Sequence, residues 1–449
     1  MPTLALLAQA LLVVAGVLTA RAALTTARTP QGAAAWVVFL VSFPLLALPA
    51  YAIFGGISRI NAGPEDRHGI PESAEPGARL ATLAGIARAR VTDGNEARLL
   101  VDGARTFDAI FAAIDAAERE VVVQSYILRP DAVGLALQGR LIAAAERGAK
   151  VYVLCDLVGS LFLGFSYVRA LRDAGVRIRG IPGPPRDVRR IGVNYRNHRK
   201  CVVVDGRVGF TGGINVGREY LDGGRRFAAW RDTHLRITGP MVGQLRDLFL
   251  ADWRAVTGEA LPPSEPAPGA GPHRGLVTGT GPTDAMERGS LLWCGLAGLS
   301  RRRLWIATPY LVPHTDLLTA LRLASLRGVD VRILIPRPSD NALAWYAGRA
   351  YARALADAGI AVHEYLPGFM HQKVVLVDDD LASVGTMNLD IRSALLNFEE
   401  TALIEDRGFA AEVEAMLSAD FARARPVDPR GSLDVRLLAP VARLFGPLL

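Results

Sequence analysis

Two copies of one short motif contain the residues of this chain best suited to chemistry. The first runs from His198 through Lys200 to Asp205, and the second runs from His371 through Lys373 to Asp378, with the same spacing. Only one other lysine occurs in the 449 residues, although Lys and Arg together number 51. A compact ammonium group and an arginine fork are not interchangeable, so lysine at these two places indicates a specific task. We infer two His/Lys pairs that converge on one phosphate.

Each motif leads into an apolar run, 201–204 or 374–377, that predicts a buried strand. Alternate residues of a strand share a face, so the histidine and lysine of each pair point the same way. Two-residue turns at 205–206 and 378–379 then fold the chain back, which sets residue 198 opposite residue 213. The returning strands bring Asn215 beside His198 and Asn388 beside His371, with equal spacing in both copies.

The duplication extends beyond the motifs and predicts an α/β fold made of two similar halves. In each half, strands alternate with helices of about a dozen residues, which is typical of a mixed sheet flanked by helices. A segment rich in proline and glycine, 261–272, separates the halves. We therefore assign 94–258 to the first half, 259–280 to a linker and 281–449 to the second half.

The N-terminal region predicts attachment to a membrane. Residues 2–20 and 29–58 carry no charge, and the apolar core 33–54 has the length that a bilayer crossing requires, about 20 residues. We predict an anchor of two transmembrane helices over 1–58, followed by a linker over 59–93. A cleaved or re-entrant first segment is the alternative, and arginines on both sides of the second stretch leave the orientation open.

The chain resembles the phospholipase D superfamily and, within it, the bacterial cardiolipin synthases. The resemblance covers nearly the whole sequence and rests on the two motifs, the N-terminal apolar pair and the segments 230–234, 308–310, 367–371, 388–393 and 397–399. It implies a multi-pass protein of the bacterial inner membrane with its catalytic halves on the cytoplasmic side. It also implies a transferase that moves a phosphatidyl group from one phosphatidylglycerol to another through a phosphohistidine, giving cardiolipin and glycerol.

The resemblance implies roles for the motif residues. His198 is expected to be the nucleophile and His371 the general acid and base. The side chains expected to hold the phosphate and stabilise its developing charge are Lys200, Lys373, Asn215, Asn388 and Thr386. Asp205 and Asp378 belong to the same motif and are included with the catalytic group, but their position at the turns favours a structural role.

A carboxylate behind each imidazole would fix its tautomer and orientation. We expect Glu399 to lie behind His371, at the family's usual distance along the chain. For His198 we choose Asp232, which follows it at a longer interval. Because one histidine must start neutral and the other protonated, we expect their surroundings to separate their pKa values.

Composition limits the partners without identifying the acceptor. The net charge of +7 favours anionic partners such as phosphatidylglycerol and anionic membrane lipid. Three cysteines, Cys155, Cys201 and Cys294, have no metal-ligand spacing, so we expect no metal or other cofactor and buried free thiols at the first two.

Three classes of function fit the motifs: a phosphatidyltransferase, a hydrolase that uses water on phospholipid or nucleic acid, and a non-enzymatic lipid-binding protein. Two complete motifs argue against a protein that only binds. The predicted membrane anchor argues against a soluble nuclease, so we expect no nucleic-acid partner. The transferase and the hydrolase share every residue named above, and they differ in how well the acceptor site excludes water.

Overall fold

The computed structural model describes residues 2–27, 30–55, 79–182, 195–265, 267–284, 286–337, 339–428 and 431–446. The chain divides into two compact units. The smaller contains residues 1–67 with 183–196 and 282–285, and the larger contains the rest, including most of both halves. Within the described ranges, the larger unit begins with helix α4 (Arg79–Ala87), in the segment that we assigned to a linker. The remainder of that predicted linker up to residue 78 lies outside the described residues.

Strands and helices alternate through both halves, as the sequence predicts. The elements of the first half are β1 (Thr92–Val101), α5 (Asp102–Asp115), β2 (Glu120–Ser125), α6 (Ala132–Glu146), β3 (Lys150–Asp156), α7 (Phe165–Asp173), β4 (Arg177–Ile181), β5 (Arg196–Asn197), β6 (Cys201–Val204), β7 (Val208–Gly212), α8 (Glu219–Asp222), β8 (Trp230–Arg231), β9 (Thr233–Thr238) and α9 (Met241–Thr257).

The second half repeats this order with additions at its end. Its elements are β10 (His273–Thr280), α10 (Arg288–Leu299), β11 (Arg303–Ala307), β12 (Leu311–Val312), α11 (Thr315–Leu326), β13 (Asp330–Pro336), α12 (Ala342–Ala356), β14 (Ala361–Tyr365), β15 (Phe369–Met370), β16 (Val374–Val377), β17 (Leu381–Gly385), β18 (Leu389–Asp390), α13 (Ile391–Leu395), β19 (Asn397–Glu405), α14 (Arg407–Ala422), β20 (Ala424–Pro426) and α15 (Leu433–Arg443). Residues 273–280, which we assigned to the linker, instead form β10.

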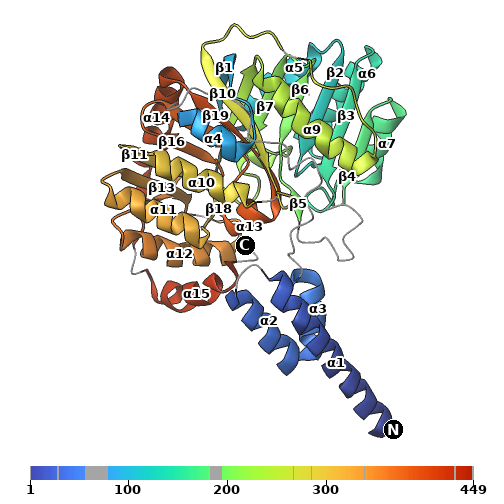
Figure 1. Ribbon diagram of the computed structural model, residues 1–449. Coiled ribbons are helices and arrows are strands. Elements are labelled where there is room, and N and C mark those ends of the chain that lie inside the picture. Colours follow the sequence, from blue (N-terminus) through green and yellow to red (C-terminus); the bar gives the residue numbers. More distant parts are fainter. Residues whose placement is uncertain are drawn as a thin grey trace. The chain divides into compact units, whose positions relative to one another are not determined.

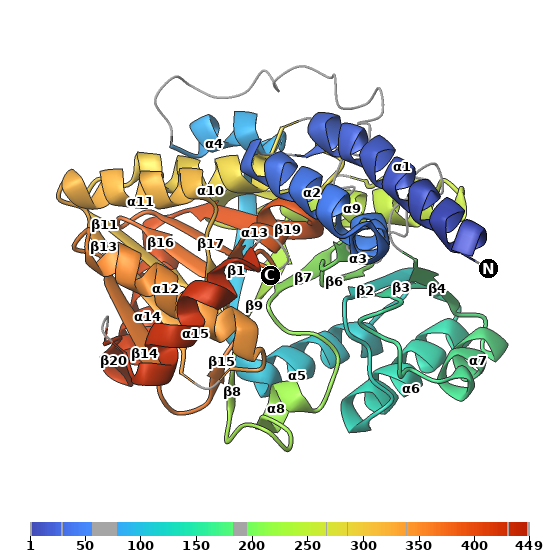
Figure 2. The same cartoon turned by 90° about the horizontal axis from the view of Figure 1, so that it is seen from below.

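The two halves share one sheet. Over the described residues it has 16 strands, and its order β14-β13-β11-β16-β17-β19-β10 in the second half mirrors β1-β9-β7-β6-β2-β3-β4 in the first. Antiparallel pairing of β10 with β1 joins the halves, which lie side by side in Figures 1 and 2. In the first half β2, β3 and β4 are parallel, and in the second half β11, β13 and β14 are parallel. The strands of each motif hairpin, β6 with β7 and β16 with β17, are antiparallel.

The halves also share a hydrophobic core. One cluster of buried side chains combines Val203 of β6 and Phe249 of α9 with Leu376 of β16 and Val413 of α14. Burial of this apolar surface is the main favourable term that holds the halves together. The thiols of Cys155 and Cys201 are buried and free, as predicted.

The two motif hairpins form, but their register differs from the prediction by one residue. Val204 pairs with Val208 and Val377 pairs with Leu381, so three residues, not two, separate the paired positions. Asp205 and Asp378 begin these turns with a φ of 53° each, in the left-handed region. Aspartate tolerates that conformation better than most residues because its short side chain can accept local hydrogen bonds.

The carboxylates of these two turn aspartates hold the hairpin to the start of a neighbouring strand. Asp205 accepts hydrogen bonds from the amides of residues 118, 119 and 120 at 3.0, 2.7 and 2.8 Å. Asp378 does the same for the amides of residues 301–303 and also binds Arg79. Both carboxylates are therefore occupied by the scaffold, which corrects their inclusion among the catalytic residues and agrees with the structural alternative.

The smaller unit contains helices α1 (Pro2–Thr26), α2 (Pro30–Ser42) and α3 (Pro44–Ala50), followed by a short π-helix at Tyr51–Gly55. The apolar stretch predicted to form one span over 33–54 is not one continuous helix, because the helix breaks at Phe43. Phe43 has φ −137° and ψ 57°, which is not helical. The next residue, Pro44, disfavours helical geometry at Phe43. Within the part of the chain that is described, we find no helix with both the length and the apolar character that spanning a bilayer demands.

We predict that Asp205→Ala lowers the free energy of unfolding by about 1–3 kcal/mol, because three main-chain amides lose their acceptor. Asp205→Asn should lose less, since its side-chain oxygen still accepts one of these bonds. Denaturant unfolding of the purified protein measures the effect. Equal stability of Asp205→Ala and the wild type would contradict a scaffold role.

Candidate functional site

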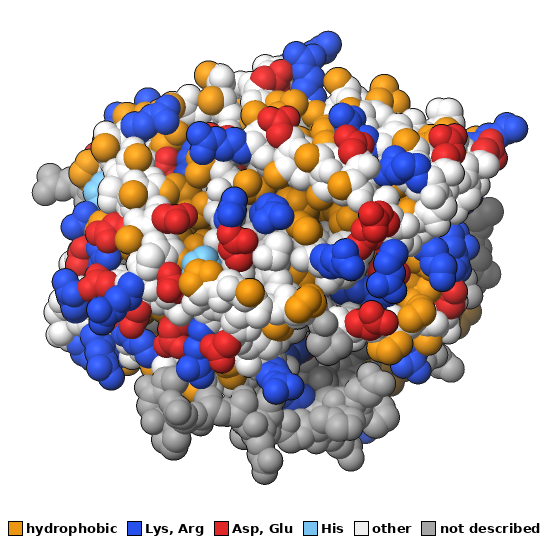
Figure 3. All heavy atoms as spheres, turned by 90° about the horizontal axis from the view of Figure 1, so that it is seen from above, with side chains coloured by type: hydrophobic (Ala, Val, Ile, Leu, Met, Phe, Trp, Pro, Cys, Tyr) orange, Lys and Arg blue, Asp and Glu red, His pale blue; other side chains and the backbone are white. Residues whose placement is uncertain are grey.

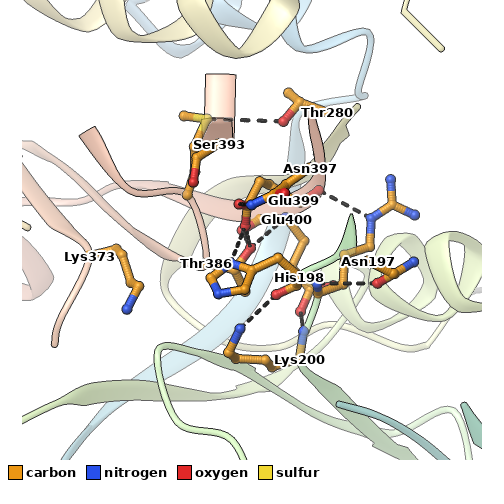
Figure 4. A network of polar contacts seen from close by, with 12 residues as sticks. Asn197, His198, Lys200, Thr280, Lys373, Thr386, Ser393, Asn397, Glu399 and Glu400 are labelled. Carbon is orange, nitrogen blue, oxygen red and sulfur yellow. Dashed lines mark hydrogen bonds and ion pairs between the residues drawn. The ribbon is translucent and has the colours of Figure 1, made fainter. Parts of the chain in front are cut away.

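The two motifs place their functional side chains at one buried site. His198, Lys200, His371 and Lys373 are each at least 92% buried, although all four are polar or charged. Each pair lies in the extended segment just before its strand, β6 or β16. Figure 4 shows His198 between Glu399 and Lys200, with Lys373 of the second half on another side of the same space. The structure therefore brings together the two pairs that the sequence predicted.

Each histidine is bound by a carboxylate of the other half. His198 Nδ1 lies 2.8 Å from Glu399 Oε2, and His371 Nδ1 lies 2.8 Å from Asp232 Oδ2. This reverses our assignment, which put Glu399 behind His371 and Asp232 behind His198. Both carboxylates orient a histidine, but the pairs are exchanged between the halves.

Main-chain pairing across the halves is the reason for this exchange. The amide of His371 donates to the carbonyl of Arg231 at 2.8 Å, and the amide of His198 donates to the carbonyl of Phe398 at 2.9 Å. β15, just before His371, also pairs in parallel with β8, just before Asp232. Each histidine is thus fixed beside the residue that precedes its carboxylate, and spacing along the chain could not reveal this.

The carboxylates occupy Nδ1 of each histidine and leave Nε2 to other partners. A carboxylate at Nδ1 accepts a hydrogen bond from the N–H there, so it selects the tautomer whose Nε2 carries a lone pair and no proton. Lys200 Nζ donates to the carbonyl of His198 at 2.7 Å, while Lys373 Nζ lies 2.9 Å from both ring nitrogens of His371. Two neutral imidazoles beside two ammonium groups can receive a phosphodiester anion and attack it.

Burial sets the protonation states of the site. It lowers the pKa of His198 to about 4 and that of His371 to about 3, with the neighbouring lysines adding to the effect. Burial also lowers the pKa of Lys200 to about 7 and that of Lys373 to about 8, against the attraction of the carboxylates. For Asp232, burial would raise the pKa, but His371 and Lys373 outweigh it and lower the value to about 2.

The expected separation of the two histidine pKa values is therefore wrong for the site without phosphate. Both values fall, because each imidazole is fully enclosed and lies near both lysines. The carboxylates of Asp232 and Glu399 instead favour the charged forms of the two lysines, and the histidines stay neutral. A bound phosphate adds negative charge, which favours the protonated form of a nearby histidine.

Thr386 has a different place from the one predicted. Its hydroxyl donates to Glu399 Oε2 at 2.5 Å and accepts from the amide of Glu400 at 2.9 Å. Asn397 donates to the other oxygen of Glu399 at 3.1 Å. The Thr386 hydroxyl, expected on the phosphate, is committed to the carboxylate behind His198.

Gly213 occupies the corresponding position of the first half, beside Asp232. A Cβ at Gly213 would lie 1.9 Å from Asp232 Oδ1, so no larger residue fits there. Trp230 Nε1 donates to Asp232 Oδ2 at 3.3 Å, and the amide of Thr233 donates to Oδ1 at 2.8 Å. The shorter acidic side chain, Asp232, thus lies against Gly213, whereas the longer one, Glu399, accepts a hydrogen bond from Thr386.

The two predicted asparagines are both buried, and their surroundings differ. Asn215 Oδ1 accepts from the amide of Ile127 at 3.1 Å, and its Nδ2 donates to the Tyr220 hydroxyl. Asn388 keeps a buried Oδ1 without a hydrogen-bond partner. Both side chains remain candidates for the phosphate, and Asn215 also supports the scaffold.

Several side chains at the site were not assigned a role from the sequence. The Tyr126 ring lies 5.1 Å from the His198 ring, edge to face, and the Trp230 ring lies 5.3 Å from that of His371.

Glu400 accepts from the amide of Lys200 at 3.0 Å and from the Thr211 hydroxyl at 2.8 Å. Burial raises the pKa of Glu400 to about 7. Aromatic or acidic type alone gave no signal for these residues, because their roles depend on contacts distant in sequence.

No three His, Cys, Asp or Glu side chains of the described residues are arranged to hold a metal ion.

Comparison with known proteins agrees with this geometry. The sequence matches the family described as cardiolipin synthase, PLD-like domain, over residues 110–253 and 296–421, one segment in each half. The chain belongs to this family. It is 41% identical over 462 residues to a cardiolipin synthase A of Pseudomonas putida, with 97% of this chain and 96% of that one covered. A cardiolipin synthase A of Pseudomonas aeruginosa is 42% identical over 464 residues, covering 97% and 94%.

Solved structures share the fold of the cardiolipin synthase family at low sequence identity. A phosphatidylserine synthase of Haemophilus influenzae matches with a TM-score of 0.60 and 16% identity, over 79% of this chain and 95% of that one. A polyphosphate kinase of Porphyromonas gingivalis matches with a TM-score of 0.52 and 16% identity, over 80% and 52%. These likenesses show the fold, while the full-length relatives show the family.

The exchanged carboxylates predict which histidine each substitution disturbs. Glu399→Gln should change the tautomer equilibrium of His198 and leave that of His371 unchanged, whereas Asp232→Asn should do the reverse. Nitrogen-15 NMR of labelled histidine side chains, assigned with single histidine substitutions, measures both. If Glu399→Gln altered His371 instead, the exchange would be refuted.

The lowered histidine pKa values predict a loss of stability in acid. Between pH 6.5 and about 4 the unfolded chain binds protons at these histidines that the folded chain does not, so stability falls as the pH falls. The loss should reach about 1–2 kcal/mol per histidine at pH 5. Urea unfolding at pH 7 and pH 5 measures it. The control is His198→Gln combined with His371→Gln, which should lose less stability over this interval; a parallel loss would exclude these histidines as the cause.

Proposed function

We propose that this protein is a cardiolipin synthase that transfers a phosphatidyl group from one phosphatidylglycerol to a second and releases glycerol. The observation that carries the proposal is the pairing of each motif histidine with a carboxylate of the other half, beside both motif lysines. Family membership and full-length similarity to cardiolipin synthase A proteins support the same activity.

In the first step, Nε2 of His198 attacks phosphorus and the bond from phosphorus to the glycerol headgroup oxygen breaks. His371, which takes up a proton at Nε2 when the negatively charged phosphate binds, gives that proton to this oxygen, so glycerol leaves as a neutral alcohol. The lysines and the two asparagines bind the non-bridging oxygens, whose charge grows in the transition state. Glu399 keeps the attacking nitrogen unprotonated by accepting a hydrogen bond from Nδ1–H of His198.

In the second step, a hydroxyl of another phosphatidylglycerol attacks the same phosphorus. His371 takes the hydroxyl proton, the bond between phosphorus and His198 breaks, and cardiolipin leaves. Water at that position would give phosphatidic acid, so the competing hydrolase differs only in the acceptor. Both steps use the same residues, and His371 returns to its starting form.

We also propose that residues 1–58 attach the enzyme to the bacterial inner membrane, with the catalytic unit on the cytoplasmic side. Support comes from the uncharged segments and from α1, whose outward side chains include exposed Leu7, Leu11 and Leu18. Close helix packing also supports the anchor, since a Cβ at Gly16 of α1 would lie 2.5 Å from the Leu40 carbonyl of α2. Small residues allow such close approach of apolar helices.

The proposal is tested with membranes that contain the protein and phosphatidylglycerol labelled in both glycerol units. We expect the wild type to give cardiolipin and an equal amount of glycerol, and His198→Ala or His371→Ala to lower the rate at least a thousandfold. Phosphatidic acid as the main product would replace the transferase with the hydrolase. Cardiolipin formed at normal rate by either variant would refute the two-histidine mechanism.

The nucleophile is identified by trapping the intermediate. A single turnover quenched in alkali should leave the labelled phosphatidyl group on His198, found by peptide mass spectrometry. Label on His371 would exchange the two roles and leave the overall reaction unchanged. Asp205→Asn is a suitable control for folding, because the Asp205 carboxylate accepts hydrogen bonds from the scaffold amides of residues 118–120.

A further inference from the structure

The loop between β3 and α7 exposes an unusual amount of apolar surface. Residues 157–165 contain no charged side chain. The large apolar side chains on its surface are between 49% and 79% exposed: Leu157, Val158, Leu161, Phe162 and Phe165. Concentrated apolar exposure of this kind marks an interaction site.

The loop is held in one conformation by buried contacts. Asp156 is 1% exposed, and its Oδ1 accepts from the amides of Val158 and Gly159, both at 2.9 Å. The amide of Leu157 donates to the carbonyl of Ile181 at 3.1 Å, and the Leu163 side chain is buried in the core. The exposed side chains are therefore presented by a fixed scaffold.

The same contacts connect the loop to the His198 side of the site. Asp156 Oδ2 accepts from the amide of Asn197, the residue before His198, at 3.1 Å. Ser160 Oγ donates to the carbonyl of Tyr126 at 3.2 Å, and the Tyr126 ring lies edge to face with His198. A Cβ at Gly159 would lie 2.2 Å from that Tyr126 carbonyl, so loop and site wall are in direct contact.

The described residues of the corresponding loop in the second half form no such surface. There the loop after β13 contains Ser339, Asp340 and Asn341, which are polar. Arg226 of the first half donates to the carbonyls of Asp340 and Ser339 at 2.8 and 3.0 Å. Among the described residues of these two loops, the large exposed apolar side chains therefore belong to the one that contacts the His198 side of the site.

We propose that residues 157–165 enter the acyl-chain region of the membrane and hold the acyl chains of the phosphatidyl group on the His198 side. The inference rests on the proposed function and specifies where its lipid lies. In the proposed mechanism the phosphatidyl group is attached to His198 between the two steps, while glycerol leaves and an acceptor enters. A fixed apolar surface beside His198 suits the group that remains.

The charge distribution favours lipid over a protein partner as the occupant. The face of the molecule seen in Figure 3 intersperses basic and acidic side chains with apolar ones, as is common for a surface in water. The loop has no charges with which to recognise a folded partner. The loop contacts a site proposed to bind a lipid phosphodiester, so we expect the acyl chains of the same lipid to lie against it.

Insertion of the loop is tested with a fluorophore attached at Phe162→Cys in the full chain, in a Cys294→Ser background because Cys155 and Cys201 are buried. The matched control is Leu326→Cys on α11, since Leu326 and Phe162 are both 79% exposed. In phosphatidylglycerol vesicles with doxyl-labelled acyl chains, we expect strong quenching at 162 and little at 326. Equal quenching at both positions, or quenching at 162 only by aqueous iodide, would overturn the proposal.

Activity provides a second test. Phe162→Asp combined with Leu161→Asp should lower turnover of phosphatidylglycerol in vesicles at least tenfold and change turnover of a monomeric short-chain phosphatidylglycerol less than twofold. Leu326→Asp should change neither. An equal loss with both substrates would show a structural role and overturn the inference. Because the quenching needs no turnover, failure of the proposed activity would leave that measurement interpretable.

Discussion

The hydrogen bond between each motif histidine and a carboxylate of the other half is the interaction on which the rest of the structure depends. It requires His198 to lie against Glu399, and His371 against Asp232, within ordinary hydrogen-bond distance. A shared sheet and a shared core meet this requirement, because they hold the halves in a fixed register. Neither half contains a complete histidine and carboxylate pair, so the duplicated fold acts as a single catalytic unit.

The same exchange shapes the electrostatics of the site. Two carboxylates and two ammonium groups are buried together, which leaves the imidazoles neutral and the local charge nearly balanced. Burying such charges is costly unless they are paired. A bound phosphodiester adds one negative charge to this balanced site. Uptake of a proton by one histidine would neutralise that charge. Binding of the substrate and protonation of one histidine are therefore linked.

Local sequence patterns predicted the local structure well. Spacing within the motifs placed His198 with Lys200 and His371 with Lys373, and apolar runs marked the strands behind them. The register was wrong by one residue because the turns at Asp205 and Asp378 contain an additional residue. A local steric effect was also underestimated, since Pro44 interrupts the second apolar helix at Phe43.

Contacts between the halves could not be predicted in this way. The sequence pairs Glu399 with His371 by proximity along the chain, whereas strand pairing across the halves gives it to His198. Thr386 was assigned to the phosphate by its position in the motif, but its hydroxyl serves Glu399. Both errors concern side chains whose partners are decided by tertiary packing.

The exchange has a consequence for the order in which the chain is made. His198 and Glu399 are separated by 201 positions, so synthesis of the first half ends long before its histidine can meet its carboxylate. An incomplete chain, still on the ribosome, has no carboxylate to orient His198. The pair at His198 is thus completed only when nearly the whole polypeptide has emerged.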